Sequence, residues 1–193
     1  MLLVGFGHKA RQGKNTAAFA LLQEMPIATN VKIYAFGDAL RAEIRSAARQ
    51  CGGGEYHLIK AFKEAGLMPD WVETESGKSR LLLQWWGTDY RRAQSPRYWI
   101  NKLFPRIDRD KVEAALIADI RFLNEAEEVK VRGGILIKCT RTGAPDFDVH
   151  EHPSEKELEG YTGWDYELVA ASVKELQDKT REVYREIVRK HVA

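Results

Sequence analysis

The chain has 193 residues, of which 44% are hydrophobic and 30% charged, and its formal net charge is +2 at pH 7. This balance excludes a disordered chain, and the length predicts one domain with a sizeable core. So small a charge argues against a nucleic-acid groove. Cys51 and Cys139 lie too far apart to indicate a zinc site or a disulfide framework. No apolar stretch approaches membrane-spanning length and the first residues do not resemble a signal peptide, so we expect a cytoplasmic protein.

The first fifty residues predict two successive strand and helix units. The apolar run 2–6 is a strand, and after a polar loop residues 15–25 have helical character. The β-branched run 31–36 predicts a second strand, followed by a helix over 39–50 with Asp38 as its N-cap.

The rest of the chain predicts a helical stretch followed by further alternation of strands and helices. In chain order we expect mostly helix over 55–109, strand 114–118, helix 124–131, strand 134–139, a polar stretch from 140, strand 168–170 and a helix capped by Ser172 that runs to about 191. Such alternation predicts an α/β fold, a mainly parallel five-stranded sheet with helices on both faces. We expect a single domain, 1–193, with a helical insertion at about 52–110 and a polar segment at about 140–163.

The loop after the first strand has the composition of a phosphate-binding loop. Its candidate nucleotide contacts are Lys9, Ala10, Arg11, Gln12, Gly13, Lys14, Asn15 and Thr16. Backbone N–H groups and the positive end of the following helix can hold a polyphosphate, and Lys14 adds a charge for its β- and γ-phosphates. Two positions depart from the strict motif: His8 stands where its first glycine falls, and Asn15 stands at the usual Ser/Thr position. The alternative is a Gly- and Lys-rich surface turn.

Two helical segments carry candidates for binding a second anion. Arg41, one turn into the predicted helix behind Asp38, can grip a phosphate bidentately, although it is equally well explained as a solvated arginine. Residues 84–92 combine aromatic, amide, carboxylate and guanidinium groups that suit a nucleotide pocket. The candidates there are Gln84, Trp85, Thr88, Asp89, Arg91 and Arg92. Some of the tryptophans in this region are expected to be core.

The ends of the third and fourth predicted strands carry further candidates. Asp119 can hold Mg²⁺ directly or through water, with Asn15 as a second candidate ligand. Arg121 can bridge an acceptor phosphate and the transferring group, and the alternative for the Asp119 and Arg121 pair is a helix cap with a surface ion pair. Arg141 opens the polar segment of about 140–163, whose two prolines and three glycines predict a loop with a short helix.

Taken together, these segments resemble the phage-type deoxynucleoside monophosphate kinases, a family of the P-loop kinase superfamily. The matching segments are 13–16, 34–40, 84–92, 117–126 and 152–155, in the family's order. The chain has Ala170 and Ala171 where the family usually has an asparagine, so no base contact is inferred there. The resemblance implies ATP and Mg²⁺ as cofactors, a deoxynucleoside monophosphate as acceptor, an acceptor-binding helical insertion, and catalytic roles for Lys14, Arg41 and Arg121. It also implies that the segment of about 140–163 is a lid that closes over ATP, with Arg141 as a lid or adenine-stacking residue.

The expected reaction is transfer of the ATP γ-phosphoryl group to a nucleoside 5′-monophosphate. The acceptor phosphate is largely ionised at pH 7, so positioning and charge neutralisation suffice and no general base is required. We expect a small-molecule substrate and neither nucleic-acid nor membrane partners, and the sequence leaves the oligomeric state open, a homodimer included. The alternatives are a related kinase of another small acceptor, such as dephospho-coenzyme A, and a regulatory module that binds nucleotide without turnover.

Overall fold

The computed structural model describes residues 1–73, 80–143 and 152–191. The chain divides into two compact units, which we describe separately. The sheet unit comprises residues 1–35 and 103–193, and the helical unit comprises residues 36–102. The helical unit overlaps the predicted insertion of about 52–110 and takes in the preceding helix as well. Of the expected lid-like segment, about 140–163, residues 144–151 lie outside the described part.

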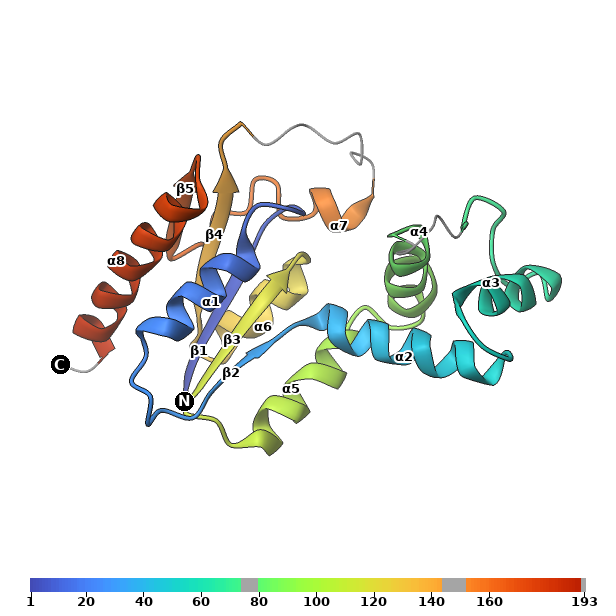
Figure 1. Ribbon diagram of the computed structural model, residues 1–193, viewed down its shortest axis with the longest axis horizontal. Helices are drawn as coiled ribbons and strands as arrows, with labels where there is room; N and C mark the ends of the chain where they lie inside the picture. The colour runs from blue at the N-terminus through green and yellow to red at the C-terminus, as the bar shows by residue number, and fades with distance from the viewer. Residues whose placement is uncertain (74–79, 144–151, 192–193) are drawn as a thin grey trace. The chain divides into compact units, whose positions relative to one another are not determined.

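The sheet unit contains five parallel strands in the order β2-β3-β1-β4-β5 (Figure 1). Its elements are β1 (Leu2–Gly7), α1 (Lys14–Glu24), β2 (Val31–Tyr34), β3 (Ala114–Ile120), α6 (Leu123–Val131), β4 (Ile135–Arg141), α7 (Pro153–Lys156), β5 (Tyr166–Ala170) and α8 (Val173–His191). A further helix, α5 (Tyr98–Asp110), begins in the helical unit and ends in the sheet unit. The predicted α/β fold with a parallel five-stranded sheet is confirmed.

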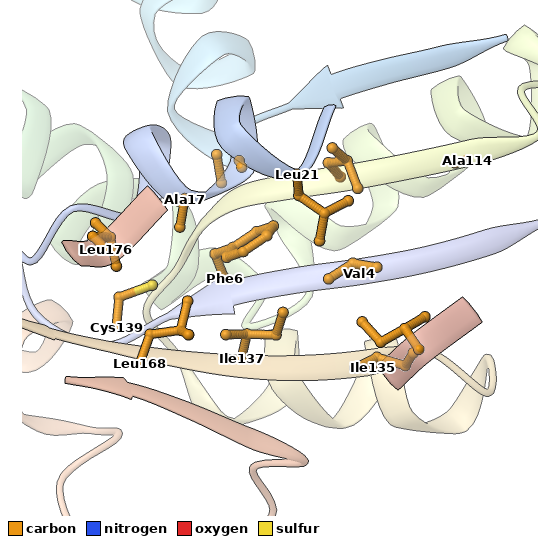
Figure 2. Close-up of a cluster of buried hydrophobic side chains, with 14 of the residues drawn as sticks. Val4, Phe6, Ala17, Leu21, Ala114, Ile135, Ile137, Cys139, Leu168 and Leu176 are labelled. Atoms are coloured by element: carbon orange, nitrogen blue, oxygen red, sulfur yellow. The ribbon is translucent and has the colours of Figure 1, made fainter. Parts of the chain in front are cut away.

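Strand side chains point alternately to opposite sides of the sheet, and helices cover the apolar side chains on both faces. Val4 and Phe6 face the cluster that α1 and α8 contribute, which includes Leu21 and Leu176 (Figure 2). On the opposite face, α6 packs against β1 and β4. The central strand β1 is therefore buried on both sides, and its carboxyl end is held firmly.

The two cysteines lie in different environments. Cys139 of β4 belongs to the same core cluster and is fully buried, whereas Cys51, just after the second helix, is half-buried. Burial raises the pKa of the Cys139 thiol to about 12, against a small lowering by the nearby charge of Lys14. The Cys139 thiol is thus neutral and packs as an apolar side chain.

The carboxyl ends of the parallel strands meet at one edge of the sheet, and this sets the position of the candidate site. Gly7, the last residue of β1, pairs with Ile120 of β3 on one side and with Lys138 of β4 on the other. In open α/β sheets this edge is where ligands bind.

Local capping was predicted correctly in one case and wrongly in another. Ser172 caps α8, since its Oγ accepts a 3.1 Å hydrogen bond from the Glu175 backbone N–H. The expected N-cap at Asp38 is wrong: helix α2 (Phe36–Gln50) begins two residues earlier, so Asp38 lies in its first turn. A carboxylate there is still favourable, because the positive end of the helix extends over the first turn.

The helical unit consists of α2, α3 (Glu55–Glu64), α4 (Arg80–Gln84), the π-helix η1 (Trp85–Arg92) and the start of α5. Its described residues contain no strand, which confirms the predicted helical character there. Aromatic rings form its centre: Trp85 stacks on Tyr90 with centroids 5.1 Å apart, and Phe62 contacts both rings.

In neither unit do the described residues include a helix with the length and apolar character needed to cross a membrane.

A half-buried carboxylate ties three elements of the helical unit together. Glu43 of α2 accepts hydrogen bonds from Trp86 Nε1 at 3.0 Å, Tyr98 OH at 2.7 Å and Lys102 Nζ at 2.8 Å, and from Arg91 Nε. Burial by itself would raise the pKa of Glu43, but the hydrogen bonds from Lys102, Trp86, Tyr98 and Arg91 outweigh it and lower the pKa to about 2. The ionised form of Glu43 therefore stabilises the folded unit.

We predict that Glu43→Gln lowers the free energy of unfolding by about 2 kcal/mol at pH 7. The folded pKa lies below the unfolded value, so the stabilisation is present above about pH 4.5 and is lost as the pH falls through 4.5 toward 2. Urea unfolding of both proteins from pH 7 to pH 3 should show the difference shrinking with acidity. Glu64→Gln, at an exposed pair 3.8 Å from Lys60, is the control and should change stability little at any pH. A difference for Glu43→Gln that does not depend on pH would contradict this account.

Candidate functional site

The loop between β1 and α1, residues 8–13, passes through positive φ at three positions. His8, Arg11 and Gly13 have φ of 102°, 59° and 89°. The position where the motif's first glycine would fall, His8, thus keeps a positive φ that favours glycine, at some cost in strain. The departure at His8 consequently changes the side chain and leaves the turn in place. The imidazole Nδ1 lies 3.3 Å from the Cys139 carbonyl oxygen, which secures the side chain against β4.

Close packing fixes both ends of this loop. A Cβ on Gly13 would lie 2.6 Å from Leu176 Cδ2 of α8, and one on Gly7 would lie 2.4 Å from the ring of Trp164. Ring and backbone can approach so closely only because these positions are glycine. The loop therefore begins and ends at points set by the core and has little freedom to shift.

Lys14, the first residue of α1, is the centre of the site. Its side chain is only 6% exposed, and Nζ donates to the backbone carbonyl oxygens of His8, at 2.8 Å, and of Lys9. Burial, helped by repulsion from Arg121, lowers the pKa of Lys14 to about 8, against the attraction of Asp119 and other groups. A cation enclosed in this way is poised to exchange carbonyl oxygens for an anion.

The end of β3 contributes Asp119 and Arg121 to the same place. Both charges act on Lys14, which puts the predicted metal ligand and the predicted catalytic arginine within electrostatic reach of the loop. The turn after β3 is held by Glu125, whose Oε2 accepts from the backbone N–H groups of Arg121, at 3.0 Å, and Phe122, at 3.2 Å. The Arg121 guanidinium forms an ion pair with Glu155 of α7.

The rest of the predicted nucleotide-contacting residues surround this centre. Arg141 ends β4, and its backbone N–H donates to Gln12 Oε1 at 2.6 Å, which joins the loop to β4. Lys9 forms an ion pair with Glu159, and the backbone N–H of Ala10 donates to Glu155 Oε2 at 2.7 Å. The structure thus brings the loop, the end of β3 and the end of β4 together.

The oxygen donors near Lys14 suit Mg²⁺ better than a transition metal. Asn15 is exposed and Thr16 half-buried in the first turn of α1, and Asp119 is half-buried at the end of β3. The described ranges contain no group of three His, Cys, Asp or Glu side chains that could hold a metal by themselves. Magnesium bound to a nucleotide needs only one or two protein oxygens, because phosphates and water supply the others. The donor set present therefore fits a nucleotide-borne Mg²⁺.

The remaining candidates lie in the helical unit. Arg41 Nη1 lies 3.3 Å from Asp38 Oδ1 in an exposed pair, with the Arg41 side chain 52% exposed, so this guanidinium is accessible to a ligand. By contrast, Arg91 is engaged by Glu43 and its guanidinium lies 4.8 Å from the centre of the Tyr90 ring. This engagement gives Arg91 a structural role in the helical unit.

Residues 84–92 differ in how they are buried. Gln84 Nε2 is buried and has no hydrogen-bond partner within the described part of the chain. Trp85 is only 4% exposed, whereas Thr88 and Arg92 are half-buried and Asp89 is exposed. An orphaned buried amide is costly, and a ligand that accepts from it would relieve that cost.

Sequence analysis assigned no role to two acidic residues, Glu43 and Glu155. The side chains of both form hydrogen bonds with residues more than thirty positions away, for example Glu155 with Ala10, and no local spacing signals such pairs.

Comparison with known proteins agrees with this geometry. No protein-family model matches the chain. Over 186 residues it is 28% identical to a protein of Acanthamoeba polyphaga mimivirus named "Putative deoxynucleotide monophosphate kinase", and the match covers 88% of each chain. The similarity supports nucleotide kinase chemistry and leaves the acceptor open.

We predict that Lys14→Met raises the free energy of unfolding by about 1 to 3 kcal/mol at pH 7. The folded pKa of Lys14, about 8, lies below the unfolded value, so the protonated lysine costs stability below pH 8 and this cost disappears as the pH rises toward 10.5. Urea unfolding at pH 7, 8, 9 and 10 should therefore show the advantage of the variant shrinking. Lys174→Met, at an exposed position of α8, is the control and should show no such trend. A variant less stable than the original protein at pH 7 would refute the enclosed-cation account.

Proposed function

We propose that this protein transfers the γ-phosphoryl group of Mg-ATP to the 5′-phosphate of a deoxynucleoside monophosphate, giving ADP and the diphosphate. The observation that carries the proposal is the enclosed ammonium of Lys14 at the head of α1, beside Arg121 at the carboxyl edge of a parallel sheet. The similar mimivirus protein is named for this activity, and we take the deoxynucleotide as the proposed acceptor from that name.

In the proposed reaction the loop 8–13 and Lys14 bind the triphosphate. Backbone N–H groups between Lys9 and Thr16, other than that of Ala10, which donates to Glu155, hold the phosphates. Lys14 leaves the carbonyl oxygens of His8 and Lys9 for the β- and γ-phosphate oxygens. The added negative charge raises the pKa of Lys14 again, so it stays protonated. Arg141, at the end of β4, contacts the adenosine part.

Arg121 and Arg41 neutralise the reacting phosphates. Arg121, 31% exposed, binds the transferring group, while Arg41 grips the acceptor phosphate bidentately with Asp38 orienting it. Asp119 and Asn15 would hold Mg²⁺, which would supply positive charge to neutralise the phosphates. Since the acceptor phosphate is already ionised, no proton has to be removed from it.

Contacts with the acceptor base come from the helical unit. Gln84 is the favoured partner, because its buried Nε2 lacks an acceptor among the described residues and a base carbonyl or ring nitrogen would supply one. Thr88, Asp89 and Arg92 are further candidates on the following π-helix, and helices of this kind are frequent at functional sites. Trp85 and Arg91 are substrate-binding candidates of lower rank, since both are engaged in the unit's own packing.

The acceptor is tested by ADP release from ATP with a panel of monophosphates. The panel contains the four deoxynucleoside monophosphates, their ribose counterparts and dephospho-coenzyme A. We expect at least one deoxynucleotide to be phosphorylated faster than its ribose counterpart. Phosphorylation of dephospho-coenzyme A alone would replace the proposed acceptor, and nucleotide binding without ADP formation would identify a regulatory module.

We predict that Lys14→Ala lowers kcat for the preferred deoxynucleotide by at least about a hundredfold, because a charge aimed at the transferring phosphate is lost. Circular dichroism should show an unchanged fold, since the variant removes a buried charge and not core packing. Lys174→Ala on the exposed surface of α8 is the matched control and should retain full activity. Turnover of Lys14→Ala within a few fold of the original rate would remove the centre of the proposed site.

A further inference from the structure

One carboxylate links the loop 8–13 to Arg121. Glu155 Oε2 accepts from the backbone N–H of Ala10 at 2.7 Å, and Glu155 Oε1 forms a charged hydrogen bond with Arg121 Nη1. Such bonds to charged groups are about twice as strong as neutral ones and fix the geometry of a guanidinium. The loop backbone and the Arg121 side chain are therefore held to a common point.

The exposed fractions of the Arg121 and Glu155 side chains show that Arg121 is the more accessible of the two. The Glu155 side chain is 8% exposed, whereas that of Arg121 is 31% exposed. A carboxylate that merely filled an open anion site would face water, and Glu155 does not. A guanidinium has five N–H donors, and a single carboxylate leaves several of them for a ligand. Arg121 is accordingly the group that can meet a substrate, with Glu155 as its support.

Both ends of Arg121 and the element that carries Glu155 are anchored. Glu125 holds the backbone N–H of Arg121, so the chain and the guanidinium are each fixed by a different carboxylate. Helix α7 is capped by His152, whose Nδ1 accepts from the Ser154 backbone N–H, and Ser154 and Leu158 on either side of Glu155 are buried. The backbone that carries Glu155 is therefore held by packing.

We propose that Glu155 is the positioning residue of Arg121: it clamps the guanidinium to the phosphate loop so that both present their donors to the transferring group in one fixed geometry. This inference rests on the proposed function. A donor that is already in place costs no reorganisation during the reaction, and a displacement of about 1 Å can cost a hundredfold in rate. The effect of Glu155 is therefore expected in kcat, with little effect on ATP binding.

The first test compares Glu155→Gln with Glu157→Gln. The two substitutions remove the same charge from the same segment, but Glu157 contacts the Leu123 backbone and not Arg121. We expect Glu155→Gln to lower kcat about 10- to 100-fold with the KM for ATP changed less than about threefold. Glu157→Gln should leave both constants within about twofold. Thermal unfolding of each variant shows whether the fold is retained, and Glu155→Asp, which keeps the charge, should recover part of kcat.

The second test asks whether Glu155 acts through Arg121. In an Arg121→Ala background, Glu155→Gln should lower kcat by less than about twofold, because the group that it positions is gone. An equal loss in both backgrounds would overturn the proposal, as would an unchanged kcat for Glu155→Gln. Tighter ATP binding by Glu155→Gln with kcat unchanged would overturn it too, and would show instead that the carboxylate competes with phosphate.

A third measurement separates the clamp from the proposed function. Exchange of the Ala10 amide hydrogen in the ligand-free protein should be at least about tenfold faster in Glu155→Ala than in Glu157→Ala, because the acceptor of that amide is lost. Equal exchange rates of the Ala10 amide in the two variants would overturn the clamp, whether or not the protein transfers a phosphoryl group. If the original protein transfers no phosphoryl group to any acceptor, the proposed function fails, while the exchange result still decides whether Glu155 holds the loop.

Discussion

The ammonium of Lys14 is kept from water by the carbonyl oxygens of the loop that precedes it, and the site depends on this enclosure. The loop can surround the cation only because its backbone turns through positive φ at three positions and is pressed between Trp164 and Leu176. The geometry of the candidate site at this edge of the sheet therefore depends on the packing around the two glycines that flank the loop. The enclosure costs folding energy, which is characteristic of groups kept for function.

The sheet and most helices could be predicted because their signals are local. Apolar runs identified the strands, and the hydroxyl of Ser172 before an amphipathic stretch identified the start of α8, since capping involves residues three positions apart. Asp38 shows the limit of the same logic. An acidic residue near a helix start is favourable at the cap and in the first turn alike, and the buried side chain of Phe36 places this helix start earlier.

The hydrogen bonds that hold the candidate site residues in place could not be predicted, because they join residues far apart in the sequence. Glu155 and Ala10, or Glu43 and Trp86, meet only after the chain has folded, and charged residues at such positions look like ordinary surface residues in sequence. Motif spacing identified the residues of the loop correctly as neighbours, yet it could not show that Arg91 is engaged by Glu43 while Arg41 is exposed. The burial and the partners of a side chain can therefore be learned only from the structure, whereas the order of strands and loops along the chain can be predicted from the sequence.

The unequal burial of the two cysteines has a practical consequence. Alkylating reagents attack the thiolate, and a buried thiol with a pKa of about 12 presents almost none at neutral pH. Cys51, half-buried just after α2, is the thiol that a maleimide dye can reach. A single fluorophore can thus be attached to the helical unit without replacing any residue, and the loop 8–13 keeps its native side chains.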